Sequence, residues 1–197
     1  MAYKTYTTDA VVVGSEDRLT ADKTIVLLTR DAGLVYARAL GVRKERSKLR
    51  YGLQDFSCVR VSLVRGKQGW RVIGAERAHN IYFSVHERAA RAALLRIVKL
   101  LRRLVRGEEA HPYLYDVVAD GLSELAACAC SDDYFLTERL LIIRVLAALG
   151  YVAPRPRYAE ALAAPTLRAA RHVLKVDPHA TPAIEQAIEY ALSASQL

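Results

Sequence analysis

The sequence predicts an α+β protein in which a small β-barrel over residues 1–80 precedes an all-α helical domain over residues 81–197. In the first part, apolar residues recur at every second position in short runs, as in strands that bury one face. In the second part they recur every three or four residues, as on the buried face of a helix. This change of period predicts two domains.

Five strands are expected in the first part, and turns that contain glycine separate several of them. The expected strands are Thr8–Val13, Thr24–Thr29, Leu34–Leu40, Phe56–Val64 and Trp70–Ala75. Five short antiparallel strands are too few for a sandwich and fit a small closed barrel. The long connection after the third strand favours a five-stranded OB-fold, which often binds single-stranded nucleic acid, over an SH3-like barrel with the same strand count.

The helices of the second part are predicted from their caps and breakers as well as from their period. They are Arg88–Arg106, Pro112–Ala127, Asp132–Leu149, Thr166–Lys175 and Pro182–Ser195. Ser131 and Thr181 are the expected N-caps of the third and the last helix. Gly150 is the expected C-terminal stop of the third helix, and two prolines within residues 151–157 predict an extended link after it.

Charge is unevenly distributed along the chain, whose formal net charge is +8. Residues 1–110 hold 22 Lys and Arg against 11 Asp and Glu, whereas residues 111–197 hold 7 against 10. A basic half joined to a slightly acidic half is typical of a polyanion-binding module attached to a part with another role.

The densest charge lies between the third and fourth expected strands, where five cations fall within eight residues. They are Arg43, Lys44, Arg46, Lys48 and Arg50. Because only Glu45 interrupts them, the pattern lacks the alternating signs of a salt-bridged helix face. We expect the loop to bind the phosphates of DNA; the alternative is a solvated loop that only increases solubility.

The last expected hairpin carries further candidates for DNA binding, Lys67, Trp70 and Arg71. Trp70 is a candidate for stacking on a base, a contact worth about 1–3 kcal/mol. It is equally a candidate for the core of the barrel, and the sequence leaves both roles open.

No arrangement of residues typical of an enzyme is found. The glycines form neither a Walker nor a dinucleotide-binding loop. Cys128 and Cys130 are one residue apart, and neither they nor the scattered histidines have the spacing of a zinc site. The acidic pairs at 108–109 and 132–133 are expected to be loop and helix-start charges. We therefore expect a binding protein that is not an enzyme and that holds no metal or cofactor.

Three cysteines are an odd number and predict reduced thiols rather than a disulfide framework. The sequence shows no leader with a cleavage site and no apolar run near the about 18 residues that cross a bilayer. These observations predict a soluble, cytoplasmic protein. Binding of the cationic helix at 88–106 to an anionic membrane is disfavoured, because the apolar face of this helix is needed to cover the helical domain.

Three segments together are similar to one known family: Tyr3–Val12, Asp22–Arg30 and, most specifically, Gly41–Phe56. They resemble the N-terminal domain of RecO, a bacterial recombination and repair protein. The resemblance continues more weakly to residues 147–154, which in many members lead into a four-cysteine zinc module. This chain has no cysteine after Cys130, so the resemblance carries no zinc site here.

The resemblance implies a DNA-binding recombination mediator in DNA repair. Such proteins bind single- and double-stranded DNA, anneal complementary strands, and act with RecR to load RecA onto strands covered by single-strand-binding protein. They work in the cytoplasm, in association with the nucleoid.

The helical domain of some members receives the acidic C-terminal tail of single-strand-binding protein. Arg96, Lys99 and Arg103 border the apolar stripe of the first long helix, and we expect them to bind this partner. The alternatives for this face are solvation or an extension of the DNA track. A second hypothesis for the whole chain is a protein-interaction adaptor whose cationic helix face binds acidic peptide tails.

Overall fold

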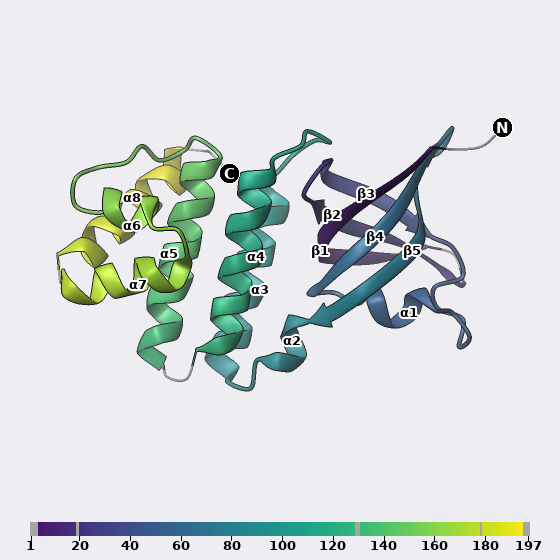
Figure 1. The fold of residues 1–197 in the computed structure, drawn as a ribbon, viewed down its shortest axis with the longest axis horizontal. Coiled ribbons are helices and arrows are strands. Elements are labelled where there is room, and N and C mark those ends of the chain that lie inside the picture. The colour runs from purple at the N-terminus through teal and green to yellow at the C-terminus, as the bar shows by residue number, and fades with distance from the viewer. Residues whose placement is uncertain (1–3, 19, 129–130, 178, 195–197) are drawn as a thin grey trace. The chain divides into compact units, whose positions relative to one another are not determined.

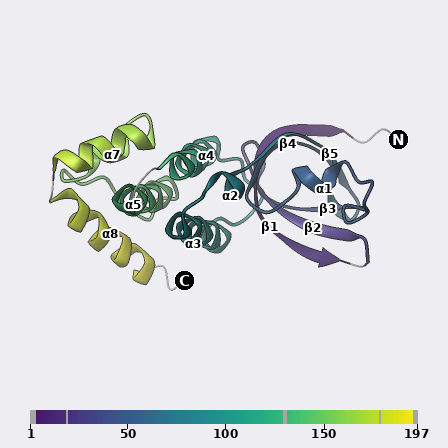
Figure 2. The same cartoon turned by 90° about the horizontal axis from the view of Figure 1, so that it is seen from below.

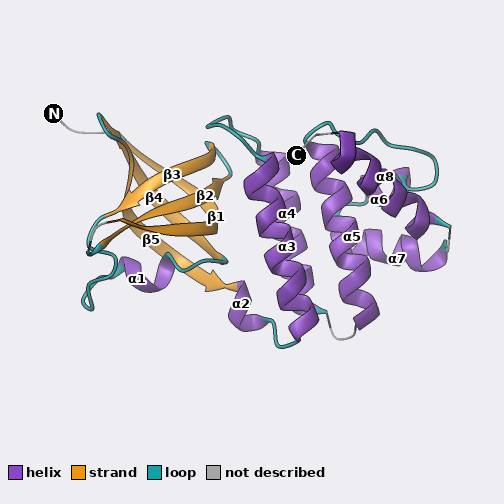
Figure 3. Ribbon diagram, turned by 180° about the vertical axis from the view of Figure 1, so that it is seen from behind, coloured by secondary structure: helices purple, strands orange, loops and turns teal. Residues whose placement is uncertain are grey.

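A computed structural model describes residues 4–18, 20–128, 131–177 and 179–194. The chain divides into two compact units (Figure 1), which are Met1–Ser84 with Val105–Tyr115, and Val85–Leu104 with Asp116–Leu197. The first unit carries the strands and the second carries most of the helical residues (Figure 3). The sequence did not foresee that residues 105–115 belong to the first unit. That residues 1–80 bind nucleic acid and residues 81–197 bind proteins stays a prediction.

The first unit is built on five strands with two short helices. Its elements are β1 (Thr5–Arg18), β2 (Asp22–Thr29), β3 (Gly33–Ala39), α1 (Leu49–Gly52), β4 (Ser57–Gly66), β5 (Gly69–Asn80) and α2 (Ile81–Ser84). The strands close into a barrel in the order β1-β2-β3-β5-β4, with β4 pairing back onto β1. All pairs are antiparallel except β3 and β5, which run parallel. This is the predicted five-stranded OB-fold, in which closure leaves no strand edge open.

The interior of the barrel is filled by the apolar residues that alternate along the strands. The core consists of Ala10, Val12, Ile25, Leu27, Val35, Ala37, Ala39, Val42, Leu53, Val59, Val61, Leu63, Trp70 and Val72. Val42 and Leu53 come from the connection between β3 and β4, not from a strand. This long connection is therefore anchored in the core near both of its ends.

The turn from β2 to β3 requires a glycine for two reasons. Gly33 has a φ of +64°, a conformation that side chains with a Cβ rarely adopt. A Cβ there would also overlap the backbone of Glu109 and lie 2.9 Å from the carbonyl oxygen of Gly107. The amide of Leu34 donates to that same Gly107 oxygen at 3.0 Å, so residues 105–115 are bonded to the barrel.

The remaining helices are α3 (Arg88–Leu104), α4 (Pro112–Ala127), α5 (Ser131–Ala148), α6 (Ala159–Ala163), α7 (Leu167–Val176) and α8 (Ala180–Ala194). The predicted apolar stripe of α3 is buried from Ala90 to Leu104. In α5, residues 140–146 are all buried, which is typical of a central helix, and α5 packs against α3, α6, α7 and α8. Where α4 meets α5, a Cβ on Gly121 would overlap the side chain of Leu141.

The expected stop of α5 at Gly150 is confirmed, and the helix expected from Thr166 begins one residue later, at Leu167. Gly150 ends α5 with a φ of +81°, and the amide of Tyr151 donates to Leu146 O at 2.8 Å while that of Gly150 donates to Ala147 O at 3.0 Å. These two bonds form a Schellman motif. Thr166 precedes α7, and its hydroxyl oxygen accepts from the Ala169 amide at 3.2 Å.

The expected start of the last helix is wrong. Helix α8 begins at Ala180, so Thr181 lies inside it and does not cap it. The carboxylate of Asp177 accepts from the His179 amide at 2.9 Å, and its carbonyl accepts from Ala180 at 3.2 Å. The helix therefore starts earlier, because an Asp side chain bonds to the backbone two residues on. The side chain of Ser131, the other expected cap, and Ser195, the expected end of the last helix, lie outside the described residues.

Candidate nucleic-acid interface

The basic loop, residues 41–50, is held in shape by its own backbone. Gly41 has a φ of +63°, and its amide donates to the carboxylate of Asp22 at 2.7 Å. Successive turns follow, with the amide of Lys44 bonded to Gly41 O, that of Ser47 to Lys44 O, and that of Arg50 to Ser47 O at 3.0–3.2 Å. Short helix α1 then packs against β5 (Figure 2). The loop is thus a folded projection rather than an extended chain.

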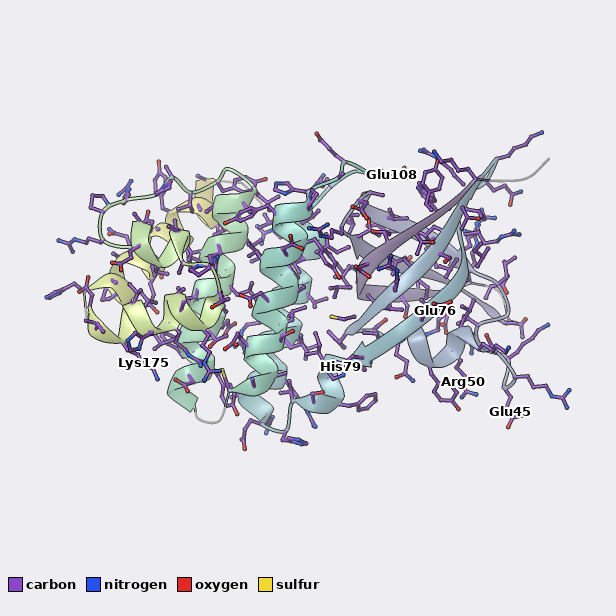
Figure 4. All side chains as sticks on the ribbon, viewed as in Figure 1. Glu45, Arg50, Glu76, His79, Glu108 and Lys175 are labelled. Atoms are coloured by element: carbon purple, nitrogen blue, oxygen red, sulfur yellow. The ribbon has the colours of Figure 1, made fainter. Side chains whose placement is uncertain are left out.

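All five cations of the basic loop are exposed: Arg43, Lys44, Arg46, Lys48 and Arg50. Figure 4 shows the side chains of Glu45 and Arg50 pointing away from the barrel. Arg43 lies 3.4 Å from a carboxylate oxygen of Asp17. Among the described residues, the other four cations form no salt bridge. Most of the positive charge of the loop therefore remains uncompensated and faces solvent.

A pocket of about 540 Å³ adjoins the basic loop. It is lined by Ser15, Lys23, Val42, Arg43, Arg50, Leu53, Gln54 and Asp55. The three cations come from β2, the loop and α1, so the barrel brings them together from distant parts of the sequence. Asp17 lies between two of them, 3.7 Å from Lys23 and 3.4 Å from Arg43. Such a concave group of cations suits an anion such as a phosphate.

Sequence reasoning did not assign Lys23 to this site. Lys23 stands opposite Asp17 in the β1–β2 hairpin and opposite Ala39 at the end of β3. Its position beside the basic loop depends on the register of three strands. A strand pattern alone gives no signal for that position.

A second group of predicted residues lies at the β4–β5 hairpin, where Lys67 and Arg71 are exposed. Trp70 lies between them in sequence but points into the barrel core and is only 7% exposed. Its ring packs edge-on against Tyr6 at a centroid distance of 5.3 Å, and the guanidinium of Arg65 lies 5.4 Å from it. Of the two roles left open by the sequence, this burial supports the core. Contact of Trp70 with DNA stays a prediction.

On α3, the three residues expected to bind a partner differ in their surroundings. Arg96 donates two hydrogen bonds to the carboxylate of Glu138, at 2.6 and 2.7 Å, and Glu138 is only 5% exposed. These bonds raise the pKa of Arg96 above its usual value. Lys99 and Arg103 are exposed and form no salt bridge within the described residues, and Leu95, one turn before Lys99, is also exposed. Arg96 is thus already paired, whereas the other two are available.

The described residues contain no group of three or more His, Cys, Asp or Glu side chains that could hold a metal ion. Cys58 is a free thiol, and burial raises its pKa to about 11, so it stays protonated near neutral pH. Cys128 is also free, and Cys130 lies outside the described residues. Within the described part of the chain, we find no helix that has both the length and the apolar character to cross a bilayer.

Comparisons with known proteins bear on both units. Residues 1–78 match the family model described as Recombination protein O N terminal. The chain is 29% identical over 154 residues to the DNA repair protein RecO of Myxococcus xanthus. The aligned residues make up 78% of this chain and 61% of that protein. It is 30% identical over 149 residues to the protein of the same name from Desulforudis audaxviator, covering 75% of this chain and 58% of that protein.

A shorter match, 40% identical over 62 residues, is to the DNA repair protein RecO of Symbiobacterium thermophilum and covers 32% of this chain and 24% of that protein. The two longer matches extend well beyond the barrel and into the helices. The chain spans about three fifths of the length of these two relatives, 61% and 58%.

Proposed function

Since the chain belongs to the RecO family, we propose that it is a DNA-binding recombination mediator in DNA repair. In this role it binds and anneals single-stranded DNA and helps to load RecA onto strands covered by single-strand-binding protein. It also binds double-stranded DNA, acts with RecR, and works at the nucleoid in the cytoplasm. The names of the relatives, all DNA repair proteins RecO, support the broad role.

One observation carries the proposal: the basic loop presents five exposed cations on a folded projection, and one of them alone has a salt bridge within the described residues. A phosphate backbone that meets such a loop releases its condensed counter-ions, which drives binding without regard to sequence. Five contacts to a single strand correspond to a slope of log affinity against log salt of about −3.5.

Annealing follows from the same charges and needs no hydrolysis of a nucleotide. Two complementary strands repel each other through their phosphates, and a cationic surface that neutralises part of this charge allows them to approach. Base pairing then supplies the free energy of the product. We therefore propose that the chain acts by binding and is not an enzyme.

We assign the acidic C-terminal tail of single-strand-binding protein to the exposed part of the α3 face. Lys99 and Arg103 would pair with its carboxylates, and the exposed Leu95 would contact an apolar side chain. Arg96 contributes less than the sequence led us to expect, because Glu138 already occupies its guanidinium.

The test of the proposed function is a salt titration. Fluorescent oligonucleotides are bound by the wild-type chain and by a triple variant, Arg43→Ala with Lys44→Ala and Arg46→Ala, between 50 and about 300 mM salt. We expect the slope to change from about −3.5 to about −1.4, because three of five contacts are lost. The loss should be the same for oligonucleotides of different sequence. An unchanged slope would exclude the loop as the DNA site.

Annealing of complementary strands should be followed by fluorescence on the same proteins, with and without single-strand-binding protein on the DNA. The wild-type chain should accelerate annealing in both cases, and the triple variant should do so much less. A chain that binds DNA but never accelerates annealing would contradict the mediator role and leave the DNA site intact.

A second candidate function is an adaptor whose cationic helix face binds acidic peptide tails. The exposure of Leu95 beside Lys99 favours this function. It predicts that an acidic peptide ending in Phe binds the purified chain and that Lys99→Ala with Arg103→Ala abolishes binding. The matched control is Arg157→Ala with Arg168→Ala, two exposed arginines elsewhere in the helical unit. Peptide binding without any DNA affinity would favour the adaptor over the mediator.

A further inference from the structure

Arg144 lies on the central helix α5 and is buried, with only 5% of its surface exposed. Its Nη2 donates a hydrogen bond of 2.7 Å to the carbonyl oxygen of Ala164, directly after the end of α6. Its Nε and Nη1 are also buried, and neither has a hydrogen-bond acceptor among the described residues. Buried donors of this kind are rare in folded proteins and indicate a group that the chain itself does not supply.

The charge of Arg144 also lacks a counterpart. An arginine side chain always carries its positive charge in a protein. Three other arginines on or against α5 each pair with a carboxylate. They are Arg96 with Glu138, Arg139 with Glu185, and Arg171 with Glu124. Arg144 forms no salt bridge within the described part of the chain. Because a buried charge without a partner is costly, Arg144 requires an anion.

The carboxylate of Asp120 on α4 does not fill this role, because it bonds to the start of α7. Its Oδ2 accepts from the amide of Leu167 at 2.6 Å. The hydroxyl of Thr166 accepts from the amide of Ala169 at 3.2 Å. The first turn of α7 thus has acceptors of its own, and the guanidinium of Arg144 remains without one on two of its nitrogens.

The surroundings of Arg144 favour a small anion with a single charge. Leu140 and Leu141, about one turn earlier on α5, are fully buried, and so is Ala161 of α6. Phosphate is multiply charged and strongly hydrated, and one guanidinium in apolar surroundings does not offset the cost of its dehydration. A monovalent anion balances one guanidinium. The site also lies close to solvent, since Pro165 and Thr166, directly after Ala164, are exposed.

We propose that Arg144 forms a binding site for a small monovalent inorganic anion such as chloride within the helical unit. The anion accepts hydrogen bonds from Nε and Nη1, while Nη2 stays bonded to Ala164. It neutralises the buried charge and joins α5 to the connection between α6 and α7. The stability of the helical unit therefore depends on the kind of anion in solution and not on ionic strength alone. The inference goes beyond the proposed function, because it concerns neither DNA nor a protein partner.

The test compares the stability of the full chain in sodium chloride and in sodium gluconate at equal ionic strength. Gluconate carries the same charge as chloride but is too large for a buried site. Arg144→Met removes the charge and the donors and keeps an unbranched side chain of good helix propensity. Arg88→Met removes an exposed arginine at the start of α3 and serves as the matched control. Urea denaturation of each protein is followed by circular dichroism.

In the wild-type chain, about 0.2 M chloride in place of gluconate should raise the ratio of folded to unfolded helical unit about 10- to 20-fold, as expected for a dissociation constant of about 10–20 mM. Arg88→Met should show the same gain, and Arg144→Met should show none. Equal stability of the wild-type chain in the two salts would overturn the inference. A gain of the same size in Arg144→Met would also overturn it, because the anion would then act elsewhere.

A second measurement locates the ion and does not depend on whether Arg144→Met folds. Bromide has the charge of chloride and a similar size, and its anomalous X-ray scattering distinguishes it from water. Crystals of the wild-type chain soaked in sodium bromide should show an anomalous peak beside Nε and Nη1 of Arg144. If bromide peaks occur only at surface cations, or if the electron density beside Arg144 is a water molecule without an anomalous signal, the inference is overturned.

Discussion

The basic loop and the cationic face of α3 both concentrate positive charge but differ in how much of that charge is available. Four of the five cations of the loop form no salt bridge within the described residues. On α3, Arg96 is held by two hydrogen bonds to the buried carboxylate of Glu138, which lies 42 residues further along the chain. The density of positive charge in a sequence therefore does not measure the charge that a ligand meets. Availability depends on which carboxylates the fold brings to each cation.

The largest effect is expected from equal charge reversals on the two surfaces. Lys44→Glu with Lys48→Glu in the basic loop should weaken binding to single-stranded DNA by at least about 25-fold at 0.1 M salt. Each lost phosphate contact removes a factor of about 5 through counter-ion release alone. Lys99→Glu with Arg103→Glu changes the net charge equally but should alter DNA affinity much less. Fluorescence anisotropy measures both, and equal losses would mean that α3 belongs to the DNA track.

The sequence was informative where a property is local. The closed barrel follows from short alternating runs and turns, and the Gly41–Phe56 segment already resembled the family that the comparisons then supported. The stop at Gly150 was equally clear, because a glycine after an apolar helix is a local signal. These features need no knowledge of which distant residues meet.

The features that escaped prediction depend on contacts between distant residues. The pairing of Arg96 with Glu138 requires that α3 and α5 pack together, and the place of Lys23 beside Arg43 requires the register of the barrel. The burial of Trp70 is decided by which face of β5 points inward. A side chain that could serve in a core or at a surface is assigned only when the sheet is closed.

The two units can be compared in stability through pH, because Cys58 belongs to the barrel unit. Its pKa is raised by burial from 9.0 to about 11. Between these values the unfolded chain releases the thiol proton while the folded chain keeps it, so stability is full below about pH 9 and falls as the pH rises towards 11. The loss should approach about 2–3 kcal/mol.

This loss can be measured by urea denaturation at pH 8, 9.5 and 10.5, followed by far-ultraviolet circular dichroism. If the two units unfold in separate transitions, the loss is expected in the transition of the barrel unit. Cys58→Ser removes the buried thiol, so this part of the pH dependence should disappear. The same slope in Cys58→Ser and in the wild-type chain would show that another group is responsible.

A smaller effect on stability is expected at the ion pair between Arg96 of α3 and Glu138. Glu138→Gln keeps the shape of the side chain but removes its charge and one of its two accepting oxygens, so only one hydrogen bond from Arg96 can remain, without its charge assistance. Because the Arg96 side chain is more than half exposed, we expect a loss of about 1–2 kcal/mol in the free energy of unfolding. Chemical denaturation measures this loss.

Glu138→Gln should also increase the affinity of the chain for an acidic peptide, since Arg96 becomes available to it. Adding Arg96→Ala should remove that gain. If Glu138→Gln leaves peptide affinity unchanged, then Arg96 lies outside the peptide site, and the difference between the two cationic surfaces has no consequence for partner binding.

The smallest effect is expected at Asp17, whose carboxylate lies within salt-bridge distance of a cation of the basic loop. Asp17 lies within salt-bridge distance of both Arg43 and Lys23; the Asp17 side chain is 62% exposed, that of Arg43 45% and that of Lys23 33%. A phosphate that binds Arg43 must compete with this carboxylate, and exposed pairs of this kind are worth about 0–1 kcal/mol. Asp17→Asn should therefore increase DNA affinity by up to about 5-fold. Glu160→Gln, an exposed carboxylate of the helical unit with the same change in charge, is the control. Since a general effect of net charge would raise affinity equally in both variants, a gain confined to Asp17→Asn would identify this carboxylate as an internal competitor for the phosphate site.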